Sequence, residues 1–394
     1  MTNKILIAEI SGKRPGGVNK RHTESFDWNY DHVIISNNSE GYETNWNVVN
    51  VPEDYQNWYK ENVATNDSSY YAPMNRSYAI KYAKDHGYKY LVQLDDNIMT
   101  FDIKYLVKRD GVQFKYTTLA ATPNKENLQN DMIKYMELVL DLTNVGMVGM
   151  APDSNSVPQD DWLKERYVYS AFMLNLEIVP PIFQGDFEDD IEYRMKLKQA
   201  GIPSLEIVPF HYSKTAQDKH NGKEDVTGNR QAYKDAGLDR GKVMSELYGD
   251  MYSRGWSDQG SGIKRIEGQR KFRHKIKPFK VGVRVKSLEI LKQGMLELFD
   301  KYATERKDSL KTSVVFPKKI FNLLVTDDNA RECILSNIIE LCIKYEMDIV
   351  EPNADYNALN TYSILFSGDQ EKLTAVKNEM KLAFDFEGVQ IIDS

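Results

Sequence analysis

The feature that most constrains the fold is a helix that leads directly into a buried strand, within residues 72–94. Apolar and small side chains recur at helical spacing along residues 72–87, and Gly87 suits the C-terminal cap of such a helix. The run YLVQL at 90–94 follows after two residues and has the length of a strand. Alternation of strand and helix predicts a mostly parallel sheet with helices on its faces. Further strand-like runs occur at 4–10, 32–37 and 46–51.

The same alternation continues to about residue 213. It predicts a first domain over residues 1–255 of the α/β class, Rossmann-like, with a mixed but mostly parallel sheet and helices on both faces. The further elements expected here are a helix at 125–146, a strand at 147–150, one or two strands of either direction within 166–179, a helix at 187–201 and a strand at 205–213.

A second domain is expected because 394 residues exceed what one hydrophobic core usually serves. Residues 256–312 read as a basic linker followed by a helix, and residues 313–394 as a small α+β domain. The order in that domain is strand, helix, strand, strand, helix, strand, which is the ferredoxin-like pattern. Its first helix carries Cys333 and Cys342, which we expect in the core. No catalytic constellation stands out there, so a binding, positioning or oligomerisation role is expected.

Composition is that of an ordinary soluble protein, with 41% hydrophobic and 28% charged residues. No apolar run approaches the roughly 18 residues that a membrane span needs. The N-terminus lacks the small-residue cleavage site of a signal peptide. Two cysteines, nine residues apart, fit neither a disulfide framework nor a thiol metal site. We therefore expect a cytoplasmic protein without a membrane partner.

Two adjacent carboxylates, Asp95 and Asp96, follow the strand at 90–94 directly, and Asn97 comes next. In an open parallel sheet, ligands bind beyond the carboxyl ends of the strands. Adjacent carboxylates there are unfavourable unless a cation neutralises them, and a divalent ion held together with substrate phosphates is the usual solution. The alternative is a polar turn whose acids cap backbone N–H groups. The residues alone leave both possibilities open.

Two later features favour a functional site at the same edge of the sheet. Five acids fall between residues 186 and 192, more than the first turn of a helix needs to match its dipole. One of them, placed in a cleft, would serve as a general base. His211 lies at the end of another expected strand, where it is either an ordinary loop residue or a neutral nitrogen ligand.

Charge is concentrated in one part of the chain. Residues 263–286 hold ten Lys or Arg against the single acid Glu267, a net charge of +9, which leaves −16 for the rest of a chain whose net charge is −7. A basic stripe on an acidic body indicates a polyanionic partner. The alternative is a solvated linker between two domains.

Taken in order along the chain, these motifs resemble those of the GT-A fold glycosyltransferases. A first strand ends in a loop, a helix carries Asn75 and Arg76, an acidic motif ends a strand, another helix opens with Glu188 and Asp189, and a histidine follows. GT-A enzymes use nucleotide sugars and have a DxD-type metal motif, and the resemblance covers about residues 1–240. The stretches KYLVQLDDNI and EISGKRPGGVNKR are most similar to the TET-associated and phage DNA glycosyltransferases, which add sugars to hydroxymethylated pyrimidines in DNA.

The resemblance implies roles for individual residues. Asp189 is the implied general base, with Glu188 beside it. Asn97 departs from the acid that the metal motif often has in its third position. The implied ligands of a Mn²⁺ or Mg²⁺ ion are Asp95, Asp96, Asn97 and His211. The implied donor-binding residues are Ser11, Gly12, Lys13, Arg14, Asn75, Arg76 and Asp95.

The function that these roles imply is transfer of glucose or arabinose from a UDP-sugar to 5-hydroxymethylcytosine in phage DNA, with a divalent metal. The basic stretch would then contact the phosphates of double-stranded DNA, and Phe272 or Phe279 would stack or wedge. No GxGxxG and no GxxxxGK[ST] occurs, which argues against a dinucleotide cofactor or a P-loop. The basic residues assigned to DNA are Lys264, Arg265, Arg270, Lys271, Arg273, Lys275, Lys277 and Lys280.

Three alternatives remain at this stage. In the first, the acceptor is a glycan, a protein or a small molecule, and the basic stretch is a linker or a contact to an acidic membrane face. The chain is a non-catalytic nucleic-acid-binding module with a decayed transferase fold, which only Asn97 supports. A nucleotidyltransferase ranks lower, because its usual sites need a third acid on a neighbouring strand and the acids here lie far apart in sequence.

Overall fold

The structure is a computed structural model of the whole chain. It describes the backbone alone for residues 104–109, 112–117, 257–258, 270–271, 300, 303 and the strands beyond residue 310. The described residues are 4–16, 21–64, 71–109, 112–117, 127–152, 162–165, 168–185, 188–214, 235–258, 270–277, 281–303, 311–315, 336, 340, 344, 348–353, 363–367, 375, 379 and 390–393.

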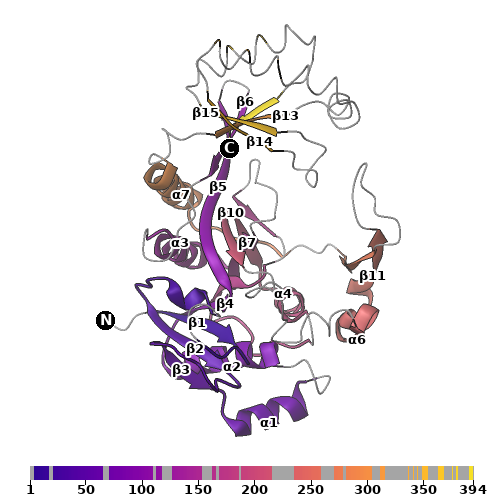
Figure 1. Cartoon of the computed structure of the whole chain (residues 1–394). Coiled ribbons are helices and arrows are strands. Elements are labelled where there is room, and N and C mark those ends of the chain that lie inside the picture. The colour runs from indigo at the N-terminus through magenta and orange to yellow at the C-terminus, as the bar shows by residue number, and fades with distance from the viewer. Residues whose placement is uncertain are drawn as a thin grey trace.

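A mixed sheet forms the centre of the molecule, in the order β3-β2-β1-β4-β9-β7-β10-β5-β6 (Figure 1). Neighbours from β3 to β4 are parallel, and so are β7 and β10. Strands β9 and β5 are antiparallel to their neighbours on both sides. Strand β6 is antiparallel to β5 and pairs on its other side with the C-terminal strand β16, in parallel, through Phe114 and Asp393. The strands are β1 Ile5–Ser11, β2 Asp31–Ser36, β3 Asn47–Asn50, β4 Tyr90–Asp95, β5 Ile98–Arg109, β6 Val112–Thr117, β7 Met147–Pro152, β9 Ala171–Asn175 and β10 Ser204–Lys214, with the short β8 Leu163–Lys164 beside β10.

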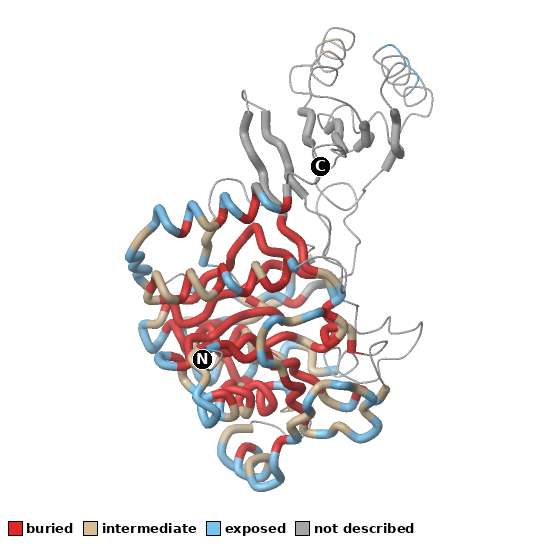
Figure 2. The backbone as a smooth tube through the Cα atoms, turned by 90° about the vertical axis from the view of Figure 1, so that its left-hand side faces the viewer, coloured by how far each residue is buried: buried red, intermediate tan, exposed pale blue. Residues whose placement is uncertain are grey.

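Helices cover both faces of this sheet, as the sequence predicted. One apolar cluster joins α1, α2 and α4 to alternate strand residues such as Leu6, and the other joins α3 and α7 to the intervening residues such as Ile7. Figure 2 shows the resulting band of buried backbone through the middle of the molecule. The helices are α1 Glu53–Asn62, α2 Tyr71–Asp85, α3 Leu128–Leu142, α4 Asp189–Gln199 and α7 Leu288–Ala303.

Outside the main sheet, part of the expected basic linker forms a hairpin. Strands β11 Tyr252–Asp258 and β12 Arg270–Ile276 pair antiparallel in a separate two-stranded sheet. The helix α6 Lys242–Tyr248 precedes the hairpin, and an apolar cluster joins both to α4 (Figure 1). The sequence predicted a linker here, whereas residues 270–276 form a strand. The side chains of this strand alternate between an apolar face and a basic face. The helix expected after the linker is confirmed as α7.

Four strands are described near the C-terminus, and their order is β14-β15-β13-β16, with each adjacent pair antiparallel. The strand expected at the start of this part, within residues 318–327, falls outside the described residues, whereas β13 was not expected. The ferredoxin-like assignment and the domain boundaries stay predictions. The strands are β13 Lys311–Val315, β14 Asp348–Asn353, β15 Ser363–Ser367 and β16 Gln390–Asp393.

Candidate active site

The carboxyl ends of strands β1, β4 and β10 lie at one edge of the sheet. Ser11 ends β1, Asp95 ends β4 and Lys214 ends β10. Asp96 and Asn97 form the turn between β4 and β5 and are only 4% and 3% exposed. The Asp96 carboxylate is therefore covered by other side chains, whereas the Asp95 side chain is 24% exposed.

Asp95 has two protein cations of its own. Arg76 Nη2 lies 2.7 Å from its Oδ1, and Lys214 Nζ lies 3.0 Å from its Oδ2. Lys214 also donates to the Ser170 hydroxyl at 2.7 Å, and the Asp95 amide donates to the Ser170 carbonyl at 2.8 Å. Burial by itself would raise the pKa of Asp95, but Lys214 and Arg76 hold it well below its ordinary value. Asp95 is thus ionised over the whole physiological range.

Asp96 has different partners and a different charge state. Its Oδ2 accepts a hydrogen bond from the Ser11 hydroxyl at 2.7 Å and lies 3.2 Å from Arg14 Nε. Burial outweighs the lowering effect of Arg14 and Ser11 and raises the pKa of Asp96 to about 6. The repulsion expected between adjacent carboxylates is therefore limited, since each pairs with its own basic side chains and one titrates near neutrality.

Arg76 is the residue that joins the two halves of the site. Its Nε lies 2.9 Å from Asp189 Oδ2, on the first turn of α4, while its Nη2 holds Asp95. The buried Gln93 of β4 fixes the same guanidinium through a 3.3 Å bond to Nη1. A buried guanidinium with two carboxylate partners has one defined geometry. The structure thus brings the predicted base and the predicted acidic motif together, although 113 residues separate Arg76 from Asp189.

The acids at the start of α4 point in different directions. Asp189 faces Arg76 and Asp95, and burial together with Asp95 raises its pKa against the lowering effect of Arg76. Burial, Asp189 and Glu188 raise the pKa of Asp190 well above its ordinary value. Glu188 instead pairs with Arg240 and His274, outside the strand edge. Sequence reasoning placed Glu188 beside the base, and the structure gives it partners in the hairpin region.

The loop after β1 is closely packed against α2. Asn75 Nδ2 donates to the Ser11 carbonyl at 2.9 Å and to Asn37 Oδ1 at 3.1 Å. A Cβ on Gly12 would lie 2.9 Å from that same Asn37 oxygen, so any other residue there would force the Asn37 amide to move. Lys13 has a positive φ of 57°, and its Nζ lies 4.8 Å from the centre of the Tyr71 ring. Asn75 therefore anchors this loop at the strand edge, and its role in binding the donor stays a prediction.

Beneath this loop lies an ion-pair cluster that sequence reasoning missed. Arg21 is fully buried, lies 3.7 Å from Glu9 Oε1 and 3.3 Å from Glu24 Oε2, and donates to the Arg14 carbonyl at 2.7 Å. Its guanidinium also stacks 4.0 Å from the centre of the Tyr42 ring. Arg21 thereby holds the backbone of Arg14, whose side chain binds Asp96. Nothing in the sequence spacing pairs an arginine at 21 with an acid inside β1.

The buried Glu9 carboxyl gives a pH dependence of stability. Burial, with Asp96 and Glu24, raises its pKa well above the ordinary 4.5, against Arg21 and Arg14. The folded state therefore keeps a proton that the unfolded chain loses, and this contribution to the free energy of unfolding falls as pH rises above about 4.5. Glu9→Gln removes it, so its stability relative to the parent protein is expected to grow with pH in urea unfolding. A constant difference, like that for the exposed control Glu40→Gln, would contradict the buried acid.

His211 does not join the acidic pair. It is fully buried in β10, opposite Asp102 of β5 in the antiparallel register, so these two side chains share one face of the sheet. Among the described residues, no three His, Cys, Asp or Glu side chains gather in a group that could hold a metal ion. Of the predicted metal ligands, Asp95, Asp96 and Asn97 lie together in the part of the chain that the structure describes, and the first two pair with Arg76, Lys214, Ser11 and Arg14.

Of the residues assigned to DNA, three are described with side chains. Arg273, Lys275 and Lys277 are all exposed. Phe272 is packed under Arg240 and is only 9% exposed, so it is not placed to stack on a base as expected. Arg270 and Lys271 lie in β12 with backbone alone described, and Lys264, Arg265, Phe279 and Lys280 lie outside the described residues.

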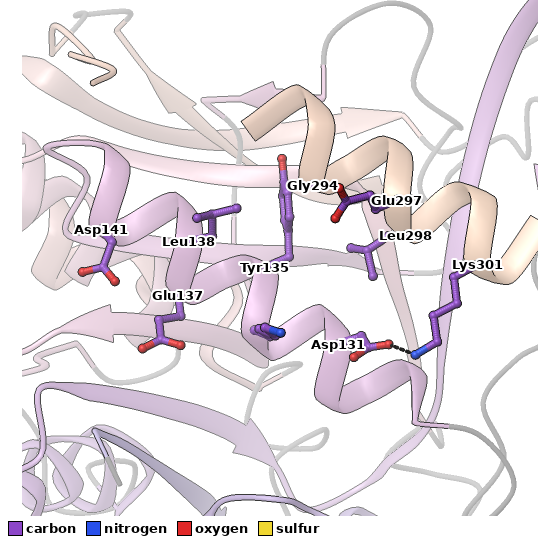
Figure 3. Close-up of a pocket in the computed structure, with 10 residues that line it drawn as sticks. Asp131, Tyr135, Glu137, Leu138, Asp141, Gly294, Glu297, Leu298 and Lys301 are labelled. Atoms are coloured by element: carbon purple, nitrogen blue, oxygen red, sulfur yellow. Dashed lines mark hydrogen bonds and ion pairs between the residues drawn. The ribbon is translucent and has the colours of Figure 1, made fainter. Parts of the chain in front are cut away.

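A pocket of about 430 Å³ lies elsewhere, between α3 and α7 (Figure 3). Both helices pack on the sheet face opposite α2 and α4. None of the predicted site residues lines this pocket, and its charges are mixed, with Lys301 pairing to Asp131 across it. Its lining residues are Asp131, Lys134, Tyr135, Glu137, Leu138, Asp141, Gly294, Glu297, Leu298 and Lys301.

Comparison with known families decides what kind of protein carries this site. A model of the TET-Associated Glycosyltransferase family matches residues 19–222, more than half of the chain. The chain belongs to this family. It is therefore a glycosyltransferase, and its mixed sheet with helices on both faces fits a Rossmann-like glycosyltransferase fold. No curated protein matches the sequence. No helix among the described residues is long and apolar enough to cross a membrane.

The TET-associated glycosyltransferase match covers most of the strand edge. It includes the Arg76 bridge, the Asp95–Asn97 turn, the start of α4 and Lys214. It excludes the loop Ser11–Arg14 and the β11–β12 hairpin. Sequence reasoning missed Lys214 and Ser170, yet Lys214 ends β10 as Asp95 ends β4, so the rule that ligands bind at strand ends would have found it.

Proposed function

We propose that this TET-associated glycosyltransferase moves a sugar, glucose or arabinose, from a UDP-sugar to 5-hydroxymethylcytosine in phage DNA. The observation that carries the proposal is the Arg76 bridge, which holds Asp95 and Asp189 on either side of one guanidinium at the strand edge. A nucleotide-sugar site needs both a charged edge that receives a diphosphate and a carboxylate that activates an alcohol. The bridge supports their presence in one place.

In the proposed reaction, the bond between the anomeric carbon and the diphosphate oxygen breaks, and UDP leaves with the electron pair. The hydroxymethyl oxygen forms the new bond to the anomeric carbon and loses its proton to Asp189. Burial raises the pKa of that carboxyl, which makes it a better base than an exposed aspartate. Arg14, Lys13 and Lys214 stand at the same edge and supply positive charge toward the leaving diphosphate.

A divalent ion, Mn²⁺ or Mg²⁺, is part of the proposal. Hard divalent ions are commonly held by one or two carboxylates together with substrate phosphates, so Asp95, Asp96 and Asn97 suit one only when the donor diphosphate is present. When bound, the ion would act as a Lewis acid on the diphosphate. Asp95 and Asp96 are paired with basic side chains, so the metal needs the diphosphate of the donor as a further ligand. We therefore expect metal binding to depend on UDP. Calorimetric titration of Mn²⁺ with and without UDP tests this.

The acceptor is tested by product analysis. The protein is incubated with a panel of UDP-sugars and with hydroxymethylcytosine DNA, unmodified DNA or free sugars, and the nucleosides are analysed by mass spectrometry. A hexose or pentose added to hydroxymethylcytidine alone supports the proposal. Transfer to free sugars but to neither DNA would replace the acceptor with a glycan. No release of UDP with any donor would indicate a binding module.

Binding to DNA is expected to weaken steeply with salt. The basic strand β12 presents Arg273 and Lys275 to solvent, with Lys277 directly after it. Each phosphate contact contributes about −0.9 to the slope of log K against log salt concentration, because counterions are released. Fluorescence anisotropy on a duplex between roughly 50 and 200 mM salt measures this slope. If the affinity for DNA did not change with salt concentration, the basic strand would not be the DNA contact.

A further inference from the structure

The first turn of α4 separates two sets of contacts. Asp189 faces the strand edge through Arg76, as described above. Glu188, the residue before it and the N-cap of the helix, faces the other way. Its Oε1 accepts from Arg240 Nε at 2.9 Å, and its Oε2 lies 3.2 Å from His274 Nε2. The two consecutive residues at the start of α4 therefore have different roles: Asp189 is the proposed base, and Glu188 contacts the β11–β12 hairpin region.

The inner face of the hairpin is built to dock on this helix. The Tyr252 hydroxyl hydrogen-bonds to His274 Nδ1 at 2.8 Å, and this bond turns Nε2 of the same ring toward Glu188 Oε2. The Arg240 guanidinium lies 4.6 Å from the centre of the Phe272 ring. A Cβ on Gly241 would lie 2.3 Å from the Tyr252 hydroxyl, so the helix α6 approaches the hairpin closely. Tyr252 also belongs to an apolar cluster with Ile191 and Met195 of α4.

The outer face of the hairpin is basic. In the antiparallel register, Lys275 lies opposite Ser253 and Arg273 lies opposite Gly255. Both basic residues are exposed, and a Cβ on Gly255 would lie only 3.7 Å from Lys275 Nζ, so the lysine lies across that glycine. Because Ser253 and Gly255 are small, the side chains of Arg273 and Lys275 dominate the surface of this face. Alternate strand residues are about 6.8 Å apart, roughly twice the 3.4 Å rise between phosphates along one DNA strand.

We propose that Glu188 is a positioning residue, which docks the β11–β12 hairpin on α4 so that the outer face of β12 holds the phosphates of duplex DNA beside the transfer site. The inference rests on the proposed function for its acceptor. The net charge of +9 in residues 263–286, on a chain that is otherwise acidic, favours a polyanion over other partners. Glu188 then acts on the acceptor through the hairpin, and the proton transfer belongs to Asp189 alone.

Two variants test the docking from opposite sides, Glu188→Ala on the helix and His274→Ala on the hairpin. Glu188→Ala removes a charge-assisted hydrogen bond from Arg240, and His274→Ala removes the imidazole that lies 3.2 Å from Glu188. We therefore expect KM for the DNA acceptor to rise about tenfold to a hundredfold in each variant, while kcat at saturating DNA changes little. His274→Gln retains a donor near Nε2 and is expected to recover part of the loss. A fall in kcat with unchanged KM in Glu188→Ala would place Glu188 at the chemistry and overturn the inference.

The outer face is tested by DNA binding, measured as anisotropy of a labelled hydroxymethylcytosine duplex. Arg273→Ala with Lys275→Ala is expected to reduce the salt slope by about 2, one for each lost phosphate contact. Lys292→Ala, an exposed lysine on α7 across the sheet, is the matched control and is expected to leave the slope unchanged. An equal effect from the control would overturn the assignment. Because this binding needs no sugar transfer, it distinguishes a failure of the hairpin from a failure of the proposed reaction.

Discussion

Asp189→Asn is expected to lower kcat for sugar transfer by about 10²–10⁴, the usual contribution of a general base. The asparagine keeps the shape of the side chain and an oxygen for Arg76, but it cannot take the proton of the acceptor alcohol. KM for the UDP-sugar is expected to change little, because Asp95, Lys214 and the loop after β1 are untouched. Steady-state kinetics with hydroxymethylcytosine DNA and a radiolabelled UDP-sugar measure both constants.

The matched control for this prediction is Asp190→Asn, the same substitution one residue later. Asp190 is the neighbouring acid, and its Oδ1 accepts from the Ile191 amide at 2.8 Å, whereas Asp189 is the acid that pairs with Arg76 at the strand edge. Replacement of Asp190 is expected to leave kcat within about tenfold of the parent protein. If Asp190→Asn lost more activity than Asp189→Asn, the base would have to be reassigned to Asp190.

Arg76→Met is expected to cost about 3–5 kcal/mol of the free energy of unfolding, since it leaves two carboxylates without the cation that they share. The guanidinium side chain is 7% exposed, and its partners Asp95 and Asp189 are 24% and 14% exposed. Because Lys214 still pairs with Asp95 in this variant, we expect the loss of stability to lie toward the lower end of this range. Urea unfolding followed by circular dichroism gives the value.

The control lies on the same helix. Lys81 pairs with Asp85 at 2.7 Å, but both side chains are more than half exposed. Lys81→Met is expected to cost no more than about 0.5 kcal/mol, as exposed helical pairs do. Arg76 and Lys81 are both basic residues of α2 and both are replaced by Met, so the comparison shows the effect of burial. Equal losses in the two variants would mean that Arg76 does not bridge the acids in solution.

The sequence predicted the central sheet because its signals are local. The helix that ends near Gly87 and the strand that follows are α2 and β4, and the chain then turns at Asp96 and Asn97 as expected. Covering of both sheet faces followed from strand–helix alternation. The position of the acidic pair at the edge of the sheet followed from the rule that ligands bind beyond the carboxyl ends of parallel strands. The burial of Asp96 was not predicted.

The contacts across that edge were not predictable, because they join residues far apart in the chain. Nothing local indicates that Arg76 faces Asp189, or that Arg21 lies under the loop after β1. The acids 188 and 189 look equivalent in sequence, whereas the helix start directs them to opposite sides. The basic stretch looked like a linker because charge dominates its composition, while Phe272 and His274 alternate with the charges and form the inner face of a strand.

The position of UDP in a crystal of the complex tests the central claim most directly. The account predicts its diphosphate beyond the ends of β1 and β4, in contact with the Ser11–Arg14 loop and beside Asp95 and Lys214. Arg76 is expected to remain bonded to Asp189 with the nucleotide in place. UDP bound in the groove between α3 and α7, or at any surface away from the Arg76 bridge, would contradict it.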